Sequence, residues 1–223
     1  MTADSGSLGD AALASIALAH ELQNSLAVVA SSLYLARRDR ADPAALERHL
    51  AASSAQVDEA QRVVRAVLRL TRGAALVGDS CAASSLVARA CRAVLSPANV
   101  RLVDTTSGDP REVHGDDTLL VRAIANLVQN AVEALGASGG AVEVSLASAD
   151  DRLVVAVEDD GPGVDPAVAE TLFEPRVTTK AYGTGVGLAF VRVVMRAHGG
   201  DVRLAAGRGR GARFELCFPP ATS

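Results

Sequence analysis

The chain has 223 residues, of which 49% are hydrophobic and 22% are charged, and its net charge at neutral pH is −4. This length and composition fit one large or two modest globular domains and exclude a disordered chain. The acidic balance argues against a nucleic-acid partner, for which a basic face would be expected.

Two further features indicate where such a chain functions. Its cysteines (Cys81, Cys91 and Cys217) lie far apart without metal-ligand spacing, which is typical of thiols in a reducing compartment. No stretch approaches the ~20 consecutive apolar residues that span a bilayer, and the N-terminus lacks the pattern of a signal peptide. We therefore expect a cytoplasmic protein without a transmembrane segment.

The N-terminal third predicts two long helices joined by a short turn. The first runs from about Leu8 to Arg38, and its apolar stripe has spacings of three and four: Ala19, Leu22, Leu26, Val29 and Leu33. Asp42 is expected to cap the second helix, with Pro43 at its first position. This helix extends to about Arg72 along a heptad-like seam of Leu46, Leu50, Ser53, Val57, Ala60, Val64, Val67 and Thr71.

Such an antiparallel hairpin has an apolar stripe too wide to remain exposed. Pairing with a second copy would bury the stripe in a four-helix bundle, which predicts a homodimer. The alternative is that both helices pack against the rest of the same chain.

The remainder of the chain predicts a second domain of mixed structure, with a boundary at Gly73 to Ser80. Helices are expected at about 84–95, 117–135 and 187–198, and strands at about 100–104, 142–147, 153–159, 201–205 and 212–218. Helices layered on one mixed or antiparallel sheet form an α+β sandwich. The predicted domains are therefore residues 8–73 and 80–220.

Two of the motifs that carry chemistry lie on predicted helices. His20 points away from the apolar stripe, with Glu21 beside it and Asn24 one turn later, so it is an exposed imidazole with a carboxylate neighbour. Asn126 and Asn130 share one helix face, and amide oxygens can bind Mg²⁺ together with phosphates. Alone, each motif is also compatible with ordinary solvated surface residues.

Two other motifs combine glycine with polar groups. Asp159 ends an apolar strand and can accept a hydrogen bond from an exocyclic amine, while Gly161 and Gly163 let the backbone approach a flat ring. Gly183, Gly185 and Gly187 lead into a helix whose N-terminus favours phosphates, and Lys180 can reach a terminal phosphate. The Walker phosphate loop and the full dinucleotide fingerprint are both absent from the sequence.

Together these motifs resemble the H, N, G1, F and G2 boxes of sensor histidine kinases. The F-box counterpart is Leu172-Phe173-Glu174-Pro175, and the resemblance covers about Ala11 to Pro219, closest to the nitrogen-regulation branch. It implies a HisKA-type dimerisation and phosphoacceptor hairpin, followed by a Bergerat-fold ATP-binding domain like those of gyrase B, MutL and the ninety-kilodalton heat-shock chaperones. The implied activity is ATP-dependent autophosphorylation, then phosphotransfer to an aspartate of a response-regulator receiver domain.

The resemblance also implies a role for each matching residue. His20 would accept the phosphate, Glu21 would be its acid/base partner and Asn24 would orient water in the reverse phosphatase reaction. Asn130 would bind Mg²⁺, Asn126 would support the phosphates and Asp159 would hold adenine. Residues 165–183 would form a mobile lid over ATP, and the remaining nucleotide contacts would be Gly161, Gly163, Lys180, Gly183, Thr184, Gly185 and Gly187.

The sequence departs from the family pattern at three positions. Ser25 stands where proline is usual, Arg176 where an aromatic residue is common and Val186 where leucine is usual. The first two bear on the balance between kinase and phosphatase activity. Because few residues precede His20, we expect the signal to come from a separate sensory or input protein. The alternatives are a dimeric scaffold or phosphotransfer protein without kinase activity, and a serine kinase of the anti-sigma type.

Overall fold

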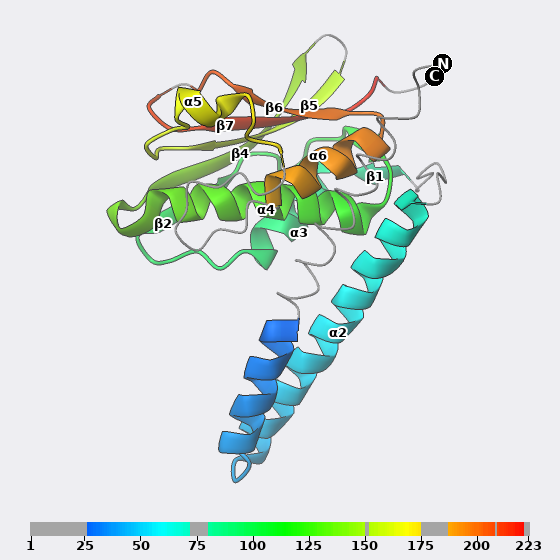
Figure 1. Cartoon of the computed structure of the whole chain (residues 1–223), viewed down its shortest axis with the longest axis vertical. Helices are drawn as coiled ribbons and strands as arrows, with labels where there is room; N and C mark the ends of the chain where they lie inside the picture. Colours follow the sequence, from blue (N-terminus) through cyan, green and yellow to red (C-terminus); the bar gives the residue numbers. More distant parts are fainter. Residues whose placement is uncertain (1–25, 72–79, 150–151, 175–186, 208, 221–223) are drawn as a thin grey trace. The chain divides into compact units, whose positions relative to one another are not determined.

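The computed structural model describes residues 26–71, 80–149, 152–174, 187–207 and 209–220 (Figure 1). The chain divides into two compact units, Met1–Gly73 and Ala74–Ser223, which are described separately below. No helix among the described residues is long and apolar enough to cross a membrane.

The first unit is a helical hairpin. Residues 26–38 are helical, and α2 (Pro43–Thr71) follows after a short turn. Asp42 caps α2, because its Oδ1 accepts hydrogen bonds from the N–H groups of Ala44 (3.0 Å) and Ala45 (3.1 Å), which confirms the predicted cap. The turn is tied to α2 by a contact of 3.2 Å between His49 Nε2 and Asp39 Oδ2.

The hairpin buries small side chains and leaves larger ones exposed. Ala36, Ala45 and Ser53 are buried, and the Ser53 hydroxyl donates to the carbonyl of His49 (3.0 Å). The exposed large apolar side chains are Leu26, Val28, Leu33, Tyr34, Leu50 and Val57. A single hairpin therefore leaves uncovered several apolar residues of the two predicted stripes.

The second unit alternates short strands with helices. Its helices are α3 (Ala83–Ala93), α4 (Asp117–Leu135), η1 (Gly136–Ser138), α5 (Pro166–Ala169) and α6 (Gly187–Ala197). Its strands are β1 (Ser80–Ala82), β2 (Val100–Asp104), β3 (Glu112–His114), β4 (Gly140–Ala149), β5 (Arg152–Asp159), β6 (Asp201–Ala205) and β7 (Arg213–Cys217). The predicted elements end within about two residues of these bounds. The elements β1, β3, η1 and α5 were not predicted, because they are too short to show a period.

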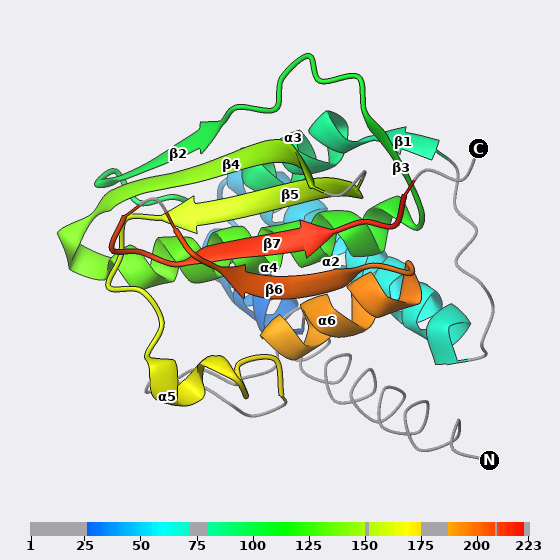
Figure 2. The same cartoon turned by 90° about the horizontal axis from the view of Figure 1, so that it is seen from above.

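Five strands form one sheet in the order β2-β4-β5-β7-β6, in which only β2 and β4 are parallel neighbours. The strands β1 and β3 pair separately. The helices α3, α4 and α6 cover one face of the sheet, whereas α5 lies beside it (Figures 1 and 2). This arrangement is the predicted α+β sandwich.

The core lies between α4 and the sheet and is almost entirely aliphatic. The apolar side of α4 contributes fully buried side chains, and Val142, Val144 and Val155 cover them from the sheet. The helix starts at an Asp116 cap, whose Oδ1 accepts from the N–H of Leu119 (3.1 Å). It ends at Gly136 with a φ of 49°, a conformation that favours glycine.

A buried histidine ties the end of α6 to the start of α4. The N–H of Asp116 donates to His198 Nε2 (3.0 Å), so the proton of the imidazole is on Nδ1, which donates to the carbonyl of Val194 (2.7 Å). Burial lowers the pKa of His198 below its usual 6.5, which keeps the ring neutral. His198 therefore fixes the position of α6 relative to α4.

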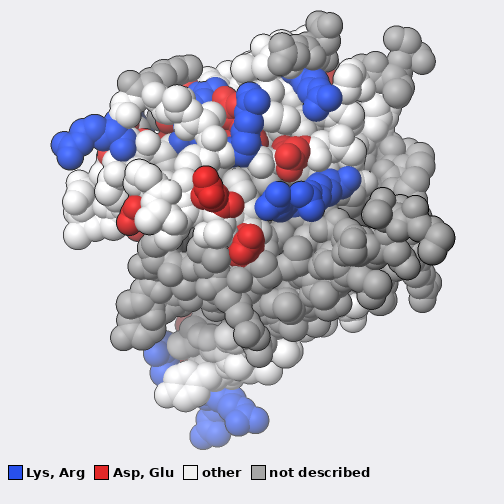
Figure 3. Space-filling model, turned by 45° about the horizontal axis from the view of Figure 1, so that its top comes forward, with Lys and Arg blue, Asp and Glu red and all other residues white. Residues whose placement is uncertain are grey.

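The other face of the sheet is polar and carries a charged network. Glu215 is paired with Arg203 (2.7 Å) and with Arg213 (2.9 Å), and Arg213 also pairs with Glu158 (2.9 Å). Figure 3 shows acidic and basic side chains interspersed on the face of the molecule in view.

Candidate functional site

The most unusual polar residue of the second unit is Asp159, at the end of β5. It is buried, with an exposed fraction of 6%. Its Oδ1 accepts hydrogen bonds from the N–H groups of Gly161 (2.8 Å) and Ala212 (3.3 Å). Burial raises the pKa of this carboxyl above 3.8, although both hydrogen bonds act in the opposite direction.

The two oxygens of Asp159 have different environments. Both hydrogen bonds found for this carboxylate among the described residues are made by Oδ1. Oδ2 is therefore available to accept a hydrogen bond from a ligand. A buried acceptor at the end of a strand, with glycines beside it, can bind the amino group of a flat ring.

Three glycines let the backbone come close around Asp159. A Cβ on Gly161 would lie 2.7 Å from Asp159 Oδ1, and one on Gly163, whose φ is 81°, would lie 2.8 Å from the carbonyl oxygen of Arg210. A Cβ on Gly211 would lie only 1.6 Å from the carbonyl oxygen of Asp159. The sequence analysis missed Gly211, although the alternating glycines at 207, 209 and 211 were a signal for a close backbone approach.

The helix α4 carries the next part of the site. Asn126 and Asn130 are half-buried and lie one turn apart on the same side of this helix. The Asn126 Nδ2 donates to the carbonyl of Arg122 (3.2 Å), and its Oδ1 lies 3.1 Å from the position of a Cβ on Gly187. The amide oxygen of Asn126 is thus directed at the first residue of α6.

The two ends of this region of α4 meet different segments. Ala134 lies near Gly161, because a Cβ on Gly161 would be 3.6 Å from the Ala134 Cβ. Asn126 lies eight residues earlier, at the N-terminus of α6. The structure therefore brings Asp159, Gly161, Asn126 and Gly187 to one side of α4, between the end of β5 and the start of α6.

A small aromatic cluster packs beside this site. Phe173 is buried and meets Phe214 edge-to-face, with 6.3 Å between the ring centroids. The guanidinium carbon of Arg192 lies 6.0 Å from the Phe173 ring centroid. Among the described residues, Arg192 Nε is buried without a hydrogen-bond partner. This cluster connects the segment that follows α5 to α6 and β7.

Several predicted site residues lie outside the described residues. These are His20, Glu21, Asn24, Lys180, Gly183, Thr184 and Gly185, together with the three departures Ser25, Arg176 and Val186. The described members of the prediction are Asn126, Asn130, Asp159, Gly161, Gly163 and Gly187. Their roles in ligand binding stay predictions.

Within the described ranges, no group of three or more His, Cys, Asp or Glu side chains is arranged to hold a metal ion. Amide oxygens and oxygens of the ligand itself could hold a divalent cation at this site. Asn126 and Asn130 supply such neutral oxygens, which suit a hard cation that retains water and binds phosphates.

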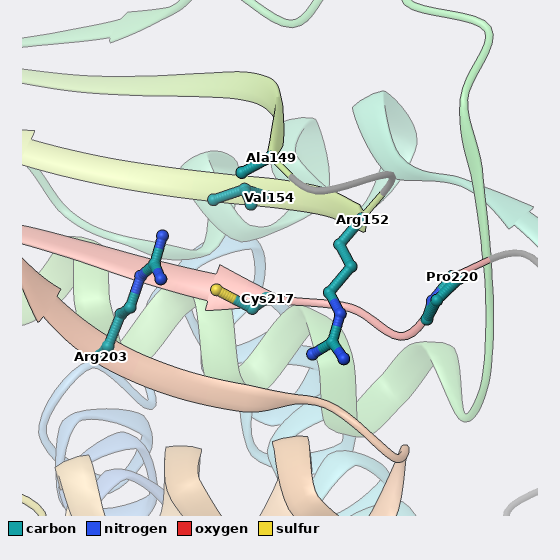
Figure 4. Close-up of a pocket in the computed structure, with 6 residues that line it drawn as sticks. All are labelled: Ala149, Arg152, Val154, Arg203, Cys217 and Pro220. Atoms are coloured by element: carbon teal, nitrogen blue, oxygen red, sulfur yellow. The ribbon is translucent and has the colours of Figure 1, made fainter.

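A separate hollow of about 320 Å³ lies on the opposite face of the sheet, lined by Ala149, Arg152, Val154, Arg203, Cys217 and Pro220 (Figure 4). Val154 and Asp159 point to opposite faces, because side chains alternate along β5. The charge of Arg203 is offset by Glu215 (2.7 Å). This hollow is therefore not part of the site around Asp159.

Comparison with known proteins identifies the second unit. Residues 115–222 match the HATPase_c family, described as histidine kinase-, DNA gyrase B- and HSP90-like ATPases. Over 91% of its length the chain is 31% identical to the sensor histidine kinase ZraS of Salmonella typhi. Over the same share it is 31% identical to the sensory histidine kinase/phosphatase NtrB of Escherichia coli O157:H7. The chain spans 44% of ZraS and 60% of NtrB.

Solved structures give the same picture of the fold. The structure of the mycobacterial sensor histidine kinase MprB aligns with 63% of this chain, and the alignment covers 97% of the MprB chain. The TM-score is 0.55 and the sequence identity is 26%. Full-length ShkA, solved in complex with AMPPNP, matches 95% of this chain and 46% of its own, with a TM-score of 0.54 and 23% identity. The likeness to ShkA shows the fold alone.

Proposed function

We propose that this chain is a protein-histidine kinase of two-component signalling. Residues 115–222 match the histidine kinase-, DNA gyrase B- and HSP90-like ATPases, and 91% of the chain is similar to sensor histidine kinases. In this proposal the chain phosphorylates itself on His20 with ATP and passes the phosphoryl group to an aspartate of a response-regulator receiver domain. The observation that carries it is the buried Asp159 carboxylate, which leaves Oδ2 available at the end of β5.

Asp159 accounts for the recognition of adenine. Its Oδ2 accepts a hydrogen bond from the exocyclic amine of the base, while Oδ1 stays bound to the N–H groups of Gly161 and Ala212. A side chain at Gly161 would occupy space beside the carboxylate and Ala134. Adenine therefore fits between the end of β5 and the C-terminal half of α4.

The phosphates extend from there along α4 toward the N-terminus of α6. That terminus carries partial positive charge, and Gly187 lets its backbone approach Asn126. Asn130 would hold Mg²⁺ and Asn126 would support the phosphates. Bound Mg²⁺ supplies charge neutralisation to the phosphate oxygens.

The phosphoryl transfer needs an acceptor from the other unit. A His20 ring nitrogen attacks the γ-phosphorus, so that a P–N bond forms, the bond to the bridging β,γ-oxygen breaks and ADP leaves. Glu21 holds the proton on the second ring nitrogen, which keeps the attacking nitrogen's lone pair free. A receiver carboxylate then takes the phosphoryl group from the histidine. For these two residues the proposal rests on the sequence motif.

We extend the proposal to the reverse reaction. The name of NtrB, one of the relatives, includes a phosphatase activity. Asn24 follows His20 by four residues in the sequence, and in this proposal its amide orients the water that hydrolyses the phosphorylated regulator.

Transfer of labelled γ-phosphate from Mg-ATP tests the central proposal. We expect acid-labile label on the wild-type chain, no label on His20→Ala and an initial rate about 100-fold lower for Asn130→Asp, because a new carboxylate repels the phosphates. His114→Ala, which changes an exposed histidine on β3, should label like the wild type. Label on His20→Ala would overturn the acceptor, and acid-stable label would identify a serine kinase. A chain that binds ATP without labelling would be a scaffold.

The exposed apolar side chains of the hairpin support a homodimer. Leu33 and Leu50 are 43% and 41% exposed in the single chain, and both belong to the predicted stripes. Burying such residues between two copies removes apolar area from water. We therefore propose that two hairpins form a four-helix bundle.

Sedimentation equilibrium measures this dimer directly. Leu50→Glu should raise the dissociation constant by about 30-fold or more, because the interface would have to bury a carboxylate. Gln61→Glu adds the same charge at an exposed position of α2 and should leave the constant unchanged. A monomeric wild-type chain would show instead that the stripe packs against the rest of the same molecule.

A further inference from the structure

The helix α4 places one basic side chain in line with the amides of the site. Arg122, Asn126 and Asn130 follow one another at intervals of four residues, so they lie on one side of the helix. Arg122 is the only arginine or lysine of α4. It is joined to the site through its carbonyl, which accepts the hydrogen bond from Asn126 Nδ2 (3.2 Å).

The contacts at Ala134 and Asn126 fix the direction in which a nucleotide lies along α4. Ala134 marks the adenine end because it lies near Gly161, and Asn126 marks the phosphate end because it meets Gly187. The helix rises about 1.5 Å per residue, so these levels are about 12 Å apart and Arg122 lies about 6 Å further on. An extended nucleoside triphosphate with its base at Asp159 therefore has its last phosphate near Arg122.

The chemistry of Arg122 suits this position. Its side chain is half-buried, and burial lowers its pKa below the usual range of an arginine. A desolvated guanidinium gains from an anion beside it, and its fork of N–H donors matches two phosphate oxygens.

We propose that Arg122 binds the terminal phosphate of ATP and makes the site selective for the triphosphate over the diphosphate. This inference rests on the proposed function, because it takes ATP as the ligand. Asp159 would then recognise the base at one end of α4 and Arg122 the γ-phosphate at the other. Arg122 would also hold the γ-phosphate while the acceptor histidine attacks.

Affinities for ATP, ADP and AMP, measured by calorimetry on the full chain with Mg²⁺, test this role. Arg122→Gln should weaken ATP about tenfold or more, since a charge-assisted contact is lost, and change AMP less than twofold. Arg122→Lys should recover part of the loss, because it keeps the charge without the fork. Arg101→Gln, at an exposed position of β2, is the matched control and should leave all three affinities unchanged.

The series separates failure of this inference from failure of the proposed function. Equal weakening of ATP, ADP and AMP by Arg122→Gln would show a structural role and overturn the inference. Unchanged affinity for ATP in both Arg122 variants would overturn it as well. A wild-type chain that binds no adenine nucleotide would refute ATP recognition itself.

Discussion

Replacing Asp159 with asparagine should abolish useful ATP affinity while leaving the fold intact. The amide oxygen can still accept from the N–H groups of Gly161 and Ala212, as Oδ1 does in the wild type. The new Nδ2 donor would face the amino group of adenine, which is also a donor. The variant would lose the charge-assisted hydrogen bond between the adenine amine and the Asp159 carboxylate, and two donors would face each other instead. Together these changes should cost about 3 kcal/mol of binding free energy, or roughly 100-fold in the dissociation constant for ATP.

The same substitution should not destabilise the free protein at neutral pH. Burial raises the pKa of Asp159 in the folded state, so this group's contribution to stability is present below the unfolded pKa of 3.8 and lost as pH rises through the folded pKa. Asparagine carries no charge and escapes this loss. Urea unfolding without nucleotide should therefore give Asp159→Asn a stability at pH 8 equal to or above that of the wild type, and the difference should shrink toward pH 4.

Inosine triphosphate provides a control for the direction of the hydrogen bond. Its 6-oxo group accepts where adenine donates, so Asp159→Asn should discriminate against ATP more than against inosine triphosphate. Equal loss for both nucleotides, with unchanged stability, would mean that Asp159 does not contact the base. A large drop in stability at pH 8 would show that the buried charge of Asp159 does not destabilise the folded protein.

Replacing Gly211 with alanine should have the largest effect on stability. The added Cβ would lie 1.6 Å from the carbonyl oxygen of Asp159. This oxygen belongs to the backbone of β5, and the position of the Cβ is set by the backbone of Gly211. No rotamer change can relieve such an overlap, so the loop that contains Gly211 must move away from the end of β5. We expect a loss of about 3 kcal/mol or more in the free energy of unfolding, together with weaker ATP binding.

Gly209→Ala is the matched control for this experiment. A Cβ at Gly209 would meet nothing within 4 Å, although it lies only two residues away in the same glycine-rich loop. Its unfolding free energy should change by less than about 0.5 kcal/mol. Urea unfolding followed by circular dichroism compares the two variants. Equal stability would mean that the loop does not approach Asp159 as closely as the structure shows.

Much of the architecture could be predicted because it is encoded in local patterns. The strand at Val100–Asp104 and the helix at Asp117–Leu135 have the bounds that were predicted, since a buried strand and an amphipathic helix each repeat with a recognisable period. The Asp42 cap followed by Pro43 was equally local. The short strands β1 and β3 were missed because three residues carry no period, and their pairing joins segments about 30 residues apart.

The order of the motifs along the sequence determined the family and the candidate residues, because an amide pair, a strand-end aspartate and glycine turns are local patterns. Only the tertiary structure decided which of them meet. The approach of Gly211 to Asp159 joins positions 52 residues apart, and that of Gly187 to Asn126 joins positions 61 apart. Such contacts depend on how strands and helices pack, and no spacing along the chain encodes that. For the same reason, the sequence alone could not relate Arg122 to the proposed phosphates. That relation depends on the packing of α4 against β5 and α6.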